Sequence, residues 1–243
     1  MDSTLSRVLS RTFYSAILLL IAAGDGRAEN NHDSLNMSLK KSFAFTVGTN
    51  RNRIEKLNDQ LDANGLAKLP ENFFSFGLNE KRRIINNVFI GLEGNVLLGR
   101  SNSTESYKSS FLGSNGIANL GYLFKFKDIV FYPLGGIGVG FYKLTISERA
   151  AYTLQEALAD PSRELNIQNS CLLLNAGFGM DFPLTVKQSS RGGKGLIIGL
   201  QTGYSFAPWV SAWKMNGQDL PGDADTGISG FYFRMTIGNG IYR

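Results

Sequence analysis

The chain has 243 residues, with 25 Lys and Arg against 20 Asp and Glu, which gives a formal net charge of +5. This length suits one domain behind a short leader, and the modest charge, with no stripe of interleaved aromatic and basic residues, argues against nucleic-acid binding. The single cysteine, Cys171, excludes an intramolecular disulfide. Glycine is enriched, with 28 residues against a usual share of ~7%.

The first 28 residues have the organisation of a secretory signal. Two arginines precede an apolar run over 16–23, and Gly26-Arg27-Ala28 places small residues at the two positions that a signal peptidase reads. The run is far shorter than the roughly 20 residues of a membrane-spanning helix. We therefore expect a cleaved signal peptide over 1–28, rather than a membrane anchor, and a flexible periplasmic lead over 29–40.

The rest of the chain, 41–243, is dominated by segments in which a large apolar residue alternates with a small or polar one. Phe43, Phe45 and Val47 begin this pattern. A period of two indicates strands with one apolar face, and here the opposite face is polar and rich in glycine. The eight predicted strands are 41–49, 72–80, 84–99, 110–126, 128–146, 166–183, 194–211 and 227–242.

The arrangement of these strands favours a barrel in lipid, since an even number of strands carries an apolar face that bears no charge. Every later apolar run is too short for a spanning helix, so any membrane span must consist of strands. The connections also alternate in length, as the short periplasmic turns and long external loops of such barrels do. The long connections are 50–71, 100–109, 147–165 and 212–226; the short ones are 81–83, Lys127 and 184–193. The sequence predicts an all-β, eight-stranded antiparallel up-and-down transmembrane β-barrel with both ends on the periplasmic side.

Two of the long loops carry helix signals. Ile54, Leu57 and Leu61 are spaced three and four residues apart, and Gly65 ends the pattern. The segment 152–158 is a second candidate. We expect short helices in these external loops, the first packed on the barrel rim as a lid; a partner-binding helix is the alternative.

Aromatic residues gather at the external end of the seventh predicted strand. Tyr204, Phe206, Trp209 and Trp213 follow one another there. Aromatic rings favour the membrane interface because the ring is apolar while the N–H or O–H contacts water. We interpret the four as interface aromatics, with a ligand-stacking site as the alternative.

Four charged residues fall on the face that would line the barrel. Glu93 and Arg234 lie near the middle of their strands, and Lys125 and Asp181 lie near the periplasmic end. A lone charge in a narrow interior would cost several kcal/mol, so we expect two pairs, Glu93 with Arg234 and Lys125 with Asp181. Such a network either fills and closes the interior or lines an ion-conducting pathway.

At this level the chain resembles the small eight-stranded outer-membrane barrels of the OmpA/OmpX type. The stretch Ile54–Gly77, with Leu69-Pro70-Glu71-Asn72-Phe73, is similar to a first-hairpin segment of barrels from Bacteroidota. The resemblance implies a place in the outer membrane of a Gram-negative bacterium, contact with outer-membrane lipid, and insertion by the barrel-assembly machinery. It does not imply one activity. The chain departs from the family in ending on Arg243 rather than on an aromatic residue.

The sequence offers little catalytic chemistry. Barrel enzymes of this class rely on a histidine, and here the only histidine is His32, in the polar lead. Neither a Cys and His cluster nor a calcium loop is recognisable, so we expect no metal, no cofactor and no catalytic residue. We predict a monomeric, non-enzymatic outer-membrane barrel with a structural or surface-interaction role through its external loops, with an unknown extracellular ligand or partner. A small or gated pore is the first alternative, and a soluble barrel that binds lipid inside, as a lipocalin does, is the second.

Overall fold

The computed structural model describes residues 39–126, 128–149, 153, 155, 164–189, 192–221 and 229–242, without the side chains of 185–189 and 192. The predicted signal peptide over 1–28 lies outside the described residues. Most of the predicted lead over 29–40 does too, and its last two residues already belong to the first strand.

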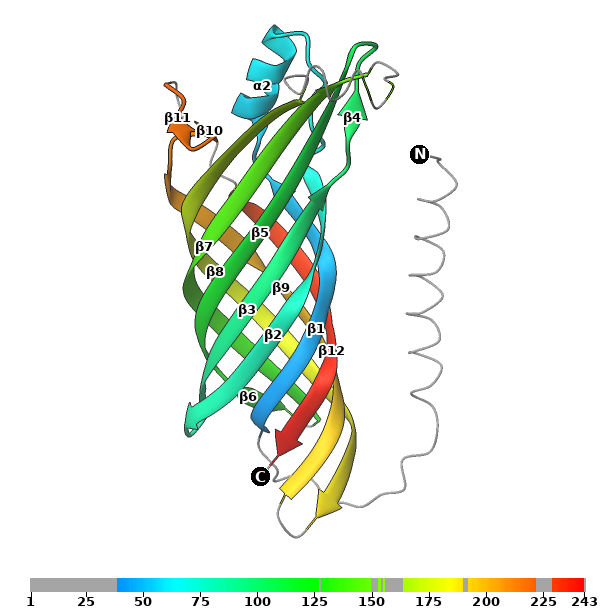
Figure 1. Ribbon diagram of the computed structural model, residues 1–243. Coiled ribbons are helices and arrows are strands. Elements are labelled where there is room, and N and C mark those ends of the chain that lie inside the picture. Colours follow the sequence, from blue (N-terminus) through cyan, green and yellow to red (C-terminus); the bar gives the residue numbers. More distant parts are fainter. Residues whose placement is uncertain are drawn as a thin grey trace. The chain divides into compact units, whose positions relative to one another are not determined.

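Eight long antiparallel strands form a closed ring. Each pairs with the next long strand along the chain, and the last pairs with the first (Figure 1). This order confirms the predicted up-and-down connectivity. The long strands are β1 (Leu39–Asn52), β2 (Asn72–Ile85), β3 (Val88–Gly99), β5 (Tyr107–Tyr122), β7 (Ile129–Glu148), β8 (Glu164–Ser189), β9 (Gly192–Val210) and β12 (Gly230–Tyr242).

Four short strands add to the eight that were predicted. They are β4 (Asn102–Ser103), β6 (Phe124–Phe126), β10 (Lys214–Met215) and β11 (Gln218–Asp219). The predicted strand 110–126 was too long, because it breaks at Leu123. The Leu123 side chain is buried and its N–H donates to the carbonyl of Asn87 at 2.7 Å, so β6 restarts outside the pairing of β5 with β3.

The ring buries its polar face and exposes its apolar face, as the alternation predicted. Leu92 is 60% exposed and Phe233 is 49% exposed, whereas the residues that follow them, Glu93 and Arg234, are 4% and 1% exposed. A soluble lipid-binding barrel needs the reverse arrangement, so the described residues contradict that alternative.

Inward glycines make room for the buried polar side chains. A Cβ atom on Gly77 would lie 2.6 Å from the Oδ1 atom of Asn95, and one on Gly199 would lie 2.4 Å from the Oδ1 atom of Asp181. Both distances are far below van der Waals contact. The glycine enrichment of the inner face is therefore a packing requirement of the polar interior.

The two ends of the ring differ. One end, the loop end, carries the helix α2 (Glu55–Ala63) and the strands β4, β10 and β11; the other, the turn end, carries the tight β2–β3 turn and β6 (Figure 1). Leu39 pairs with Tyr242 at the turn end, so both ends of the ring-forming chain lie there, as predicted.

Two of the predicted short connections are instead strand. In the predicted turn 81–83, Arg82 pairs with Ile90, and in the predicted turn 184–193, Ser189 pairs with Gly192. The β2–β3 turn lies at Asn86–Asn87, where Asn86 has a φ of 47°. The basic residues at 81–83 continue the strand, because side-chain alternation persists through them, with Lys81 buried and Arg82 exposed.

The helix α2 confirms the first loop prediction. Ile54, Leu57 and Leu61 are 1%, 4% and 4% exposed, and Gly65 follows the helix with a φ of 69°. The second predicted helix, over 152–158, falls largely outside the described residues. Within the described part of the chain, no helix is long and apolar enough to cross a membrane.

Candidate functional site

The interior of the ring, here called the lumen, is filled by side chains in three layers. A hydrophobic cluster lies at the loop end, a polar layer lies in the middle, and a second hydrophobic cluster with one ion pair lies at the turn end. Alternate residues of every long strand point inward and form most of these layers, while α2 and the loops add further side chains at the loop end. Which of these inward positions are polar therefore decides what the lumen can do.

Glu93 is the centre of the polar layer. Arg234 of β12 forms a salt bridge with it, which confirms the predicted pairing. The Nδ2 atom of Asn95 also donates to the Glu93 carboxylate at 2.7 Å, and the amides of Asn79 and Gln201 donate at 3.4 and 3.3 Å. The carboxylate is thus solvated by protein donors from β2, β3, β9 and β12, which offsets much of the cost of its burial.

Arg234 also packs on an aromatic ring. Its guanidinium carbon lies 4.1 Å from the centre of the Tyr232 ring. A guanidinium over an aromatic face gains a cation–π interaction, which is strongest where water is excluded. The arginine is therefore held on one side by a carboxylate and on another by a ring.

Amide side chains extend the polar layer around the lumen. Asn95 donates to Asn115 at 3.0 Å and accepts from Thr46 at 3.1 Å. On the other side, Asn175 donates to Asn119 at 2.9 Å. The bonds made by Thr46 and Asn175 join strands that are not neighbours in the ring, so they brace the wall from within.

The second predicted pair was wrong. Asp181 forms its salt bridge with Lys81 rather than with Lys125. Tyr132 completes the group, since its hydroxyl accepts from the Lys81 ammonium at 3.0 Å and donates to Asp181 at 3.1 Å. Lys125 lies exposed on β6, beyond the break at Leu123 that moves it off the inner face.

The sequence did contain the signal for Lys81. It follows Ser75, Gly77 and Asn79 at steps of two, so an uninterrupted strand places its side chain inward. The predicted strand 72–80 ends five residues before β2 does, so it left Lys81 in a predicted turn. If the alternation continues to Lys81 and stops at Leu123, it predicts Lys81 inside the lumen as the partner of Asp181 and leaves Lys125 outside.

The turn end of the lumen is closed below this ion pair. Buried apolar and aromatic side chains meet there from five of the long strands and from the β5–β6 link: Leu39, Phe89, Leu123, Val130, Tyr132, Leu134, Ile197 and Tyr242. The cavity lined by Asn79, Lys81, Asp181 and Thr236 has a volume of only about 10 Å³. That is about the space that one water molecule needs.

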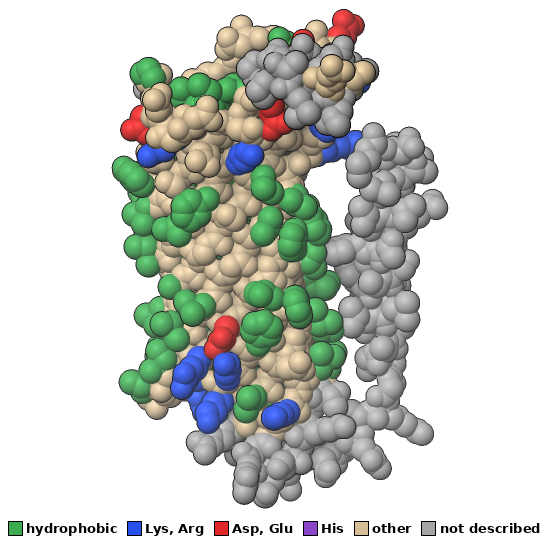
Figure 2. Space-filling model, in the orientation of Figure 1, with side chains coloured by type: hydrophobic (Ala, Val, Ile, Leu, Met, Phe, Trp, Pro, Cys, Tyr) green, Lys and Arg blue, Asp and Glu red, His purple; other side chains and the backbone are tan. Residues whose placement is uncertain are grey.

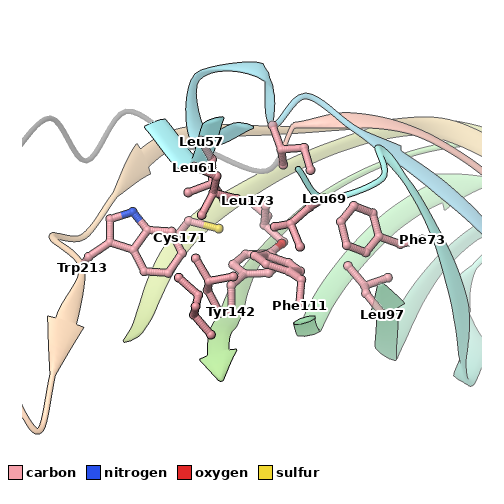
Figure 3. Close-up of a cluster of buried hydrophobic side chains, with 13 residues drawn as sticks. Leu57, Leu61, Leu69, Phe73, Leu97, Phe111, Tyr142, Cys171, Leu173 and Trp213 are labelled. Atoms are coloured by element: carbon pink, nitrogen blue, oxygen red, sulfur yellow. The ribbon is translucent and has the colours of Figure 1, made fainter. Parts of the chain in front are cut away.

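The loop end is closed by a larger cluster (Figure 3). Leu57 and Leu61 of α2 point down onto inward-facing side chains of the ring, among them Phe111 and Leu173. The side chain of Asn58 fixes the returning loop, because it donates to the carbonyl of Leu69 at 2.9 Å and accepts from its N–H at 2.8 Å. The segment 50–71 is therefore a packed lid, as predicted.

The interface aromatics are only partly as predicted. Phe206 and Trp209 are 49% and 59% exposed on the outer wall, and Tyr204 is half-buried with its ring 4.8 Å from that of Phe231. Trp213 is 9% exposed and belongs to the loop-end cluster (Figure 3). The alternation ends with β9 at Val210, so the position of Trp213 could not be extrapolated from the strand.

Cys171 is also part of the loop-end cluster and is 2% exposed. We expect a maleimide to leave this thiol unmodified in the folded protein and to label it fully after denaturation, because the folded cluster excludes the reagent. Mass spectrometry of samples quenched over a time course measures the modified fraction. Rapid labelling under native conditions would show that the lid segment 50–71 opens readily.

The described residues hold no cluster of His, Cys, Asp and Glu that could bind a metal ion. The two buried carboxylates, Glu93 and Asp181, are both ion-paired inside the lumen. The side chains of the lumen can therefore fill the ring and brace its wall. Apolar side chains cover the lumen at both ends.

Comparisons with known proteins are distant. No protein family and no curated protein matches the sequence. The fold is similar to that of Ail, the attachment invasion locus protein of Yersinia pestis solved with the heparin analogue sucrose octasulfate, at 12% identity over 84% of this chain and 100% of that chain, with a TM-score of 0.42. It is also similar to a major outer membrane protein of Thermus thermophilus, at 9% identity over 83% and 99% of the two chains, with a TM-score of 0.41.

A third similar structure is the translocator domain of the autotransporter NalP from Neisseria meningitidis. Its identity is 10%, the matched regions cover 97% of this chain and 96% of that chain, and the TM-score is 0.36. At such identities and scores, a function cannot be transferred from any of the three. The function must be inferred from the surface and interior of the ring itself.

Proposed function

We propose that the protein is a monomeric β-barrel of the outer membrane of a Gram-negative bacterium, with a closed lumen and a structural or surface-interaction role at its loop end. One observation carries the proposal: large apolar side chains cover the outer wall, while the charged residues of the strands' inner face form ion pairs inside. In water this arrangement would leave a very large apolar surface exposed. In lipid it is the expected one.

The apolar wall has the height of a membrane. On β7 the outward residues run from Phe131 to Phe141 before Lys143 follows. That is about 33 Å of strand, which spans about 25 Å at the usual tilt of ~40°. Figure 2 shows the same order on one face, with apolar side chains between Lys and Arg at both ends.

The loop end supports a surface role. It carries α2, β4 and the β10–β11 hairpin, whereas the turn end has a two-residue turn between β2 and β3. In such barrels the long loops face outward from the cell. We therefore assign the loop end to the cell surface, with contacts to a partner made by the loops and the upper side of the lid segment 50–71.

Catalysis is not part of the proposal. The only histidine of the sequence, His32, precedes the ring, and both buried carboxylates of the described lumen have cationic partners. A general base at neutral pH most often needs an imidazole in the site. We infer a binding or structural protein on these grounds.

A gated pore is the second candidate, favoured by the polar middle layer with its ion pair and amides. The clusters at both ends oppose it, because an ion would have to pass two apolar plugs. Conductance separates the two functions. We expect no channel events in planar bilayers for the native protein, and regular unitary events would establish the pore.

Localisation and orientation can be tested on intact cells. We expect the protein in the outer-membrane fraction, with heat-modifiable mobility in gels, and we expect external trypsin to cut after Arg149 or Arg163, in the long connection between β7 and β8. Cleavage after Arg191, between β8 and β9, should need permeabilised cells. Cutting confined to Arg191 in intact cells would reverse the orientation, and recovery in the soluble fraction would refute the membrane location.

A further inference from the structure

We propose that a groove on the outer wall, at the loop end, binds the phosphate group of an outer-leaflet lipid; this inference rests on the proposed membrane location. The groove has a volume of about 450 Å³, and Lys143, Gln168 and Lys214 line its upper part. A second hollow of about 250 Å³ adjoins it and shares these three residues. Lys143 and Lys214 at the upper edge of an apolar wall suit an amphiphilic ligand with an anionic head group.

The strand register builds the head-group site. Lys143 of β7 pairs with Gln168 of β8, and Gln168 pairs with Lys214 of β10. Residues opposite each other on adjacent strands have Cβ atoms ~5 Å apart, so the three side chains form one short row. Two ammonium groups with an amide between them can donate several hydrogen bonds to one phosphate.

The charges of this row are available to a ligand. Among the described residues, Lys143 has no carboxylate partner. Lys214 has one, Asp219, at 3.4 Å, and the two side chains are 46% and 67% exposed. An exposed pair of this kind contributes little, so a phosphate can compete for Lys214.

The wall below the row changes step by step from polar to apolar. The next row holds Phe141, Ser170 and Ser211, and the two serine hydroxyls lie 3.2 Å apart. Below it, Leu172 pairs with the exposed Trp209. A lipid with its phosphate at the lysines would thus have the serine hydroxyls, which bond to each other and to the Ala212 carbonyl, beneath its head group and its acyl chains along an apolar wall.

Trp209 provides the measurement, because it lies on this wall. In a Trp213→Phe background it is the only tryptophan, and bromine atoms on a neighbouring acyl chain quench its fluorescence. The protein is reconstituted in phosphatidylcholine vesicles containing increasing fractions of dibromostearoyl phosphatidic acid or dibromostearoyl phosphatidylcholine. We expect the phosphatidic acid to reach half-maximal quenching at a roughly 25-fold lower fraction, since each of the two lysines near a membrane surface attracts anionic lipid by about fivefold.

Matched variants decide where the preference arises. Lys143→Gln with Lys214→Gln should abolish it, whereas Lys68→Gln with Lys108→Gln removes the same charge from the loop end outside the groove and should retain it. The site would be overturned if the groove variant kept the native preference for phosphatidic acid, or if both variants lost that preference equally. It would also be overturned if the native protein showed no such preference. Reversal of quenching by inorganic phosphate would also overturn it, by showing an anion site that needs no lipid.

The same experiment separates this inference from the proposed function. Quenching by brominated phosphatidylcholine alone reports that the outer wall lies in lipid. If that quenching is absent, the membrane location fails. If it is present without any preference for phosphatidic acid, the location stands and only the lipid site is wrong.

Discussion

Replacing Glu93 by Gln should lower the free energy of unfolding by roughly 3–5 kcal/mol, because it leaves the Arg234 guanidinium buried without a counter-charge. Arg234 is 1% exposed and Glu93 4%, so water cannot replace the lost partner. Arg234→Gln should cost a similar amount, since Glu93 would keep only amide donors. Urea unfolding in lipid vesicles, followed by tryptophan fluorescence, measures both changes.

The double variant Glu93→Gln with Arg234→Gln provides the decisive comparison. It should be clearly more stable than the sum of the single losses predicts, because no unpaired charge remains. Strictly additive losses would contradict the pairing. A matched control is Lys41→Gln with Glu80→Gln, an ion pair at 2.9 Å whose side chains are 46% and 39% exposed, for which we expect a coupling below ~1 kcal/mol.

Conductance of the same variants tests whether the ion pair also blocks ion flow. We expect Arg234→Gln to remain closed, because the clusters at the two ends of the lumen do not include this residue. Channel events in Arg234→Gln but not in the native protein would favour the gated pore. The stability and conductance measurements thus address separate properties of one residue.

The sequence predicts the ring well because one simple rule governs it. The period of two assigned Leu92 outward and Glu93 inward, and the positions of Glu93 and Arg234 along their strands were enough to predict their pairing. The rule works over long strands because a single shift in register would turn every side chain to the wrong face.

The failures lie where this rule stops. Lys125 and Trp213 both follow a break in their strand, at Leu123 and after Val210, and local backbone geometry then decides their direction. The lipid groove is a different case, since it depends on the register between β7, β8 and β10. Which residues lie side by side across strands cannot be read from spacing within one strand.

Replacing Leu92 by Arg should destabilise the protein in bilayers by ~2–4 kcal/mol, the cost of a charge on the lipid face near the midplane. Leu92 is 60% exposed and points away from the lumen, next to Glu93 of the central polar layer, and the carboxylate of its cross-strand neighbour Glu80 is already paired with Lys41. The measurement is urea unfolding of the reconstituted protein, with the midpoint and slope compared with those of the native chain.

Leu98→Arg is the matched control, because it makes the same substitution on the same outward face of β3. Leu98 is 42% exposed and pairs with Leu112, which lies in register with Lys143 at the loop end. An arginine there can extend its charge to the interface, so we expect a loss of only ~0–1 kcal/mol. Equal losses at Leu92 and Leu98 would contradict a membrane that surrounds the middle of the ring. A neutral Leu92→Arg would mean that this wall faces water, and the proposed location would then have to be abandoned together with the lipid site that rests on it.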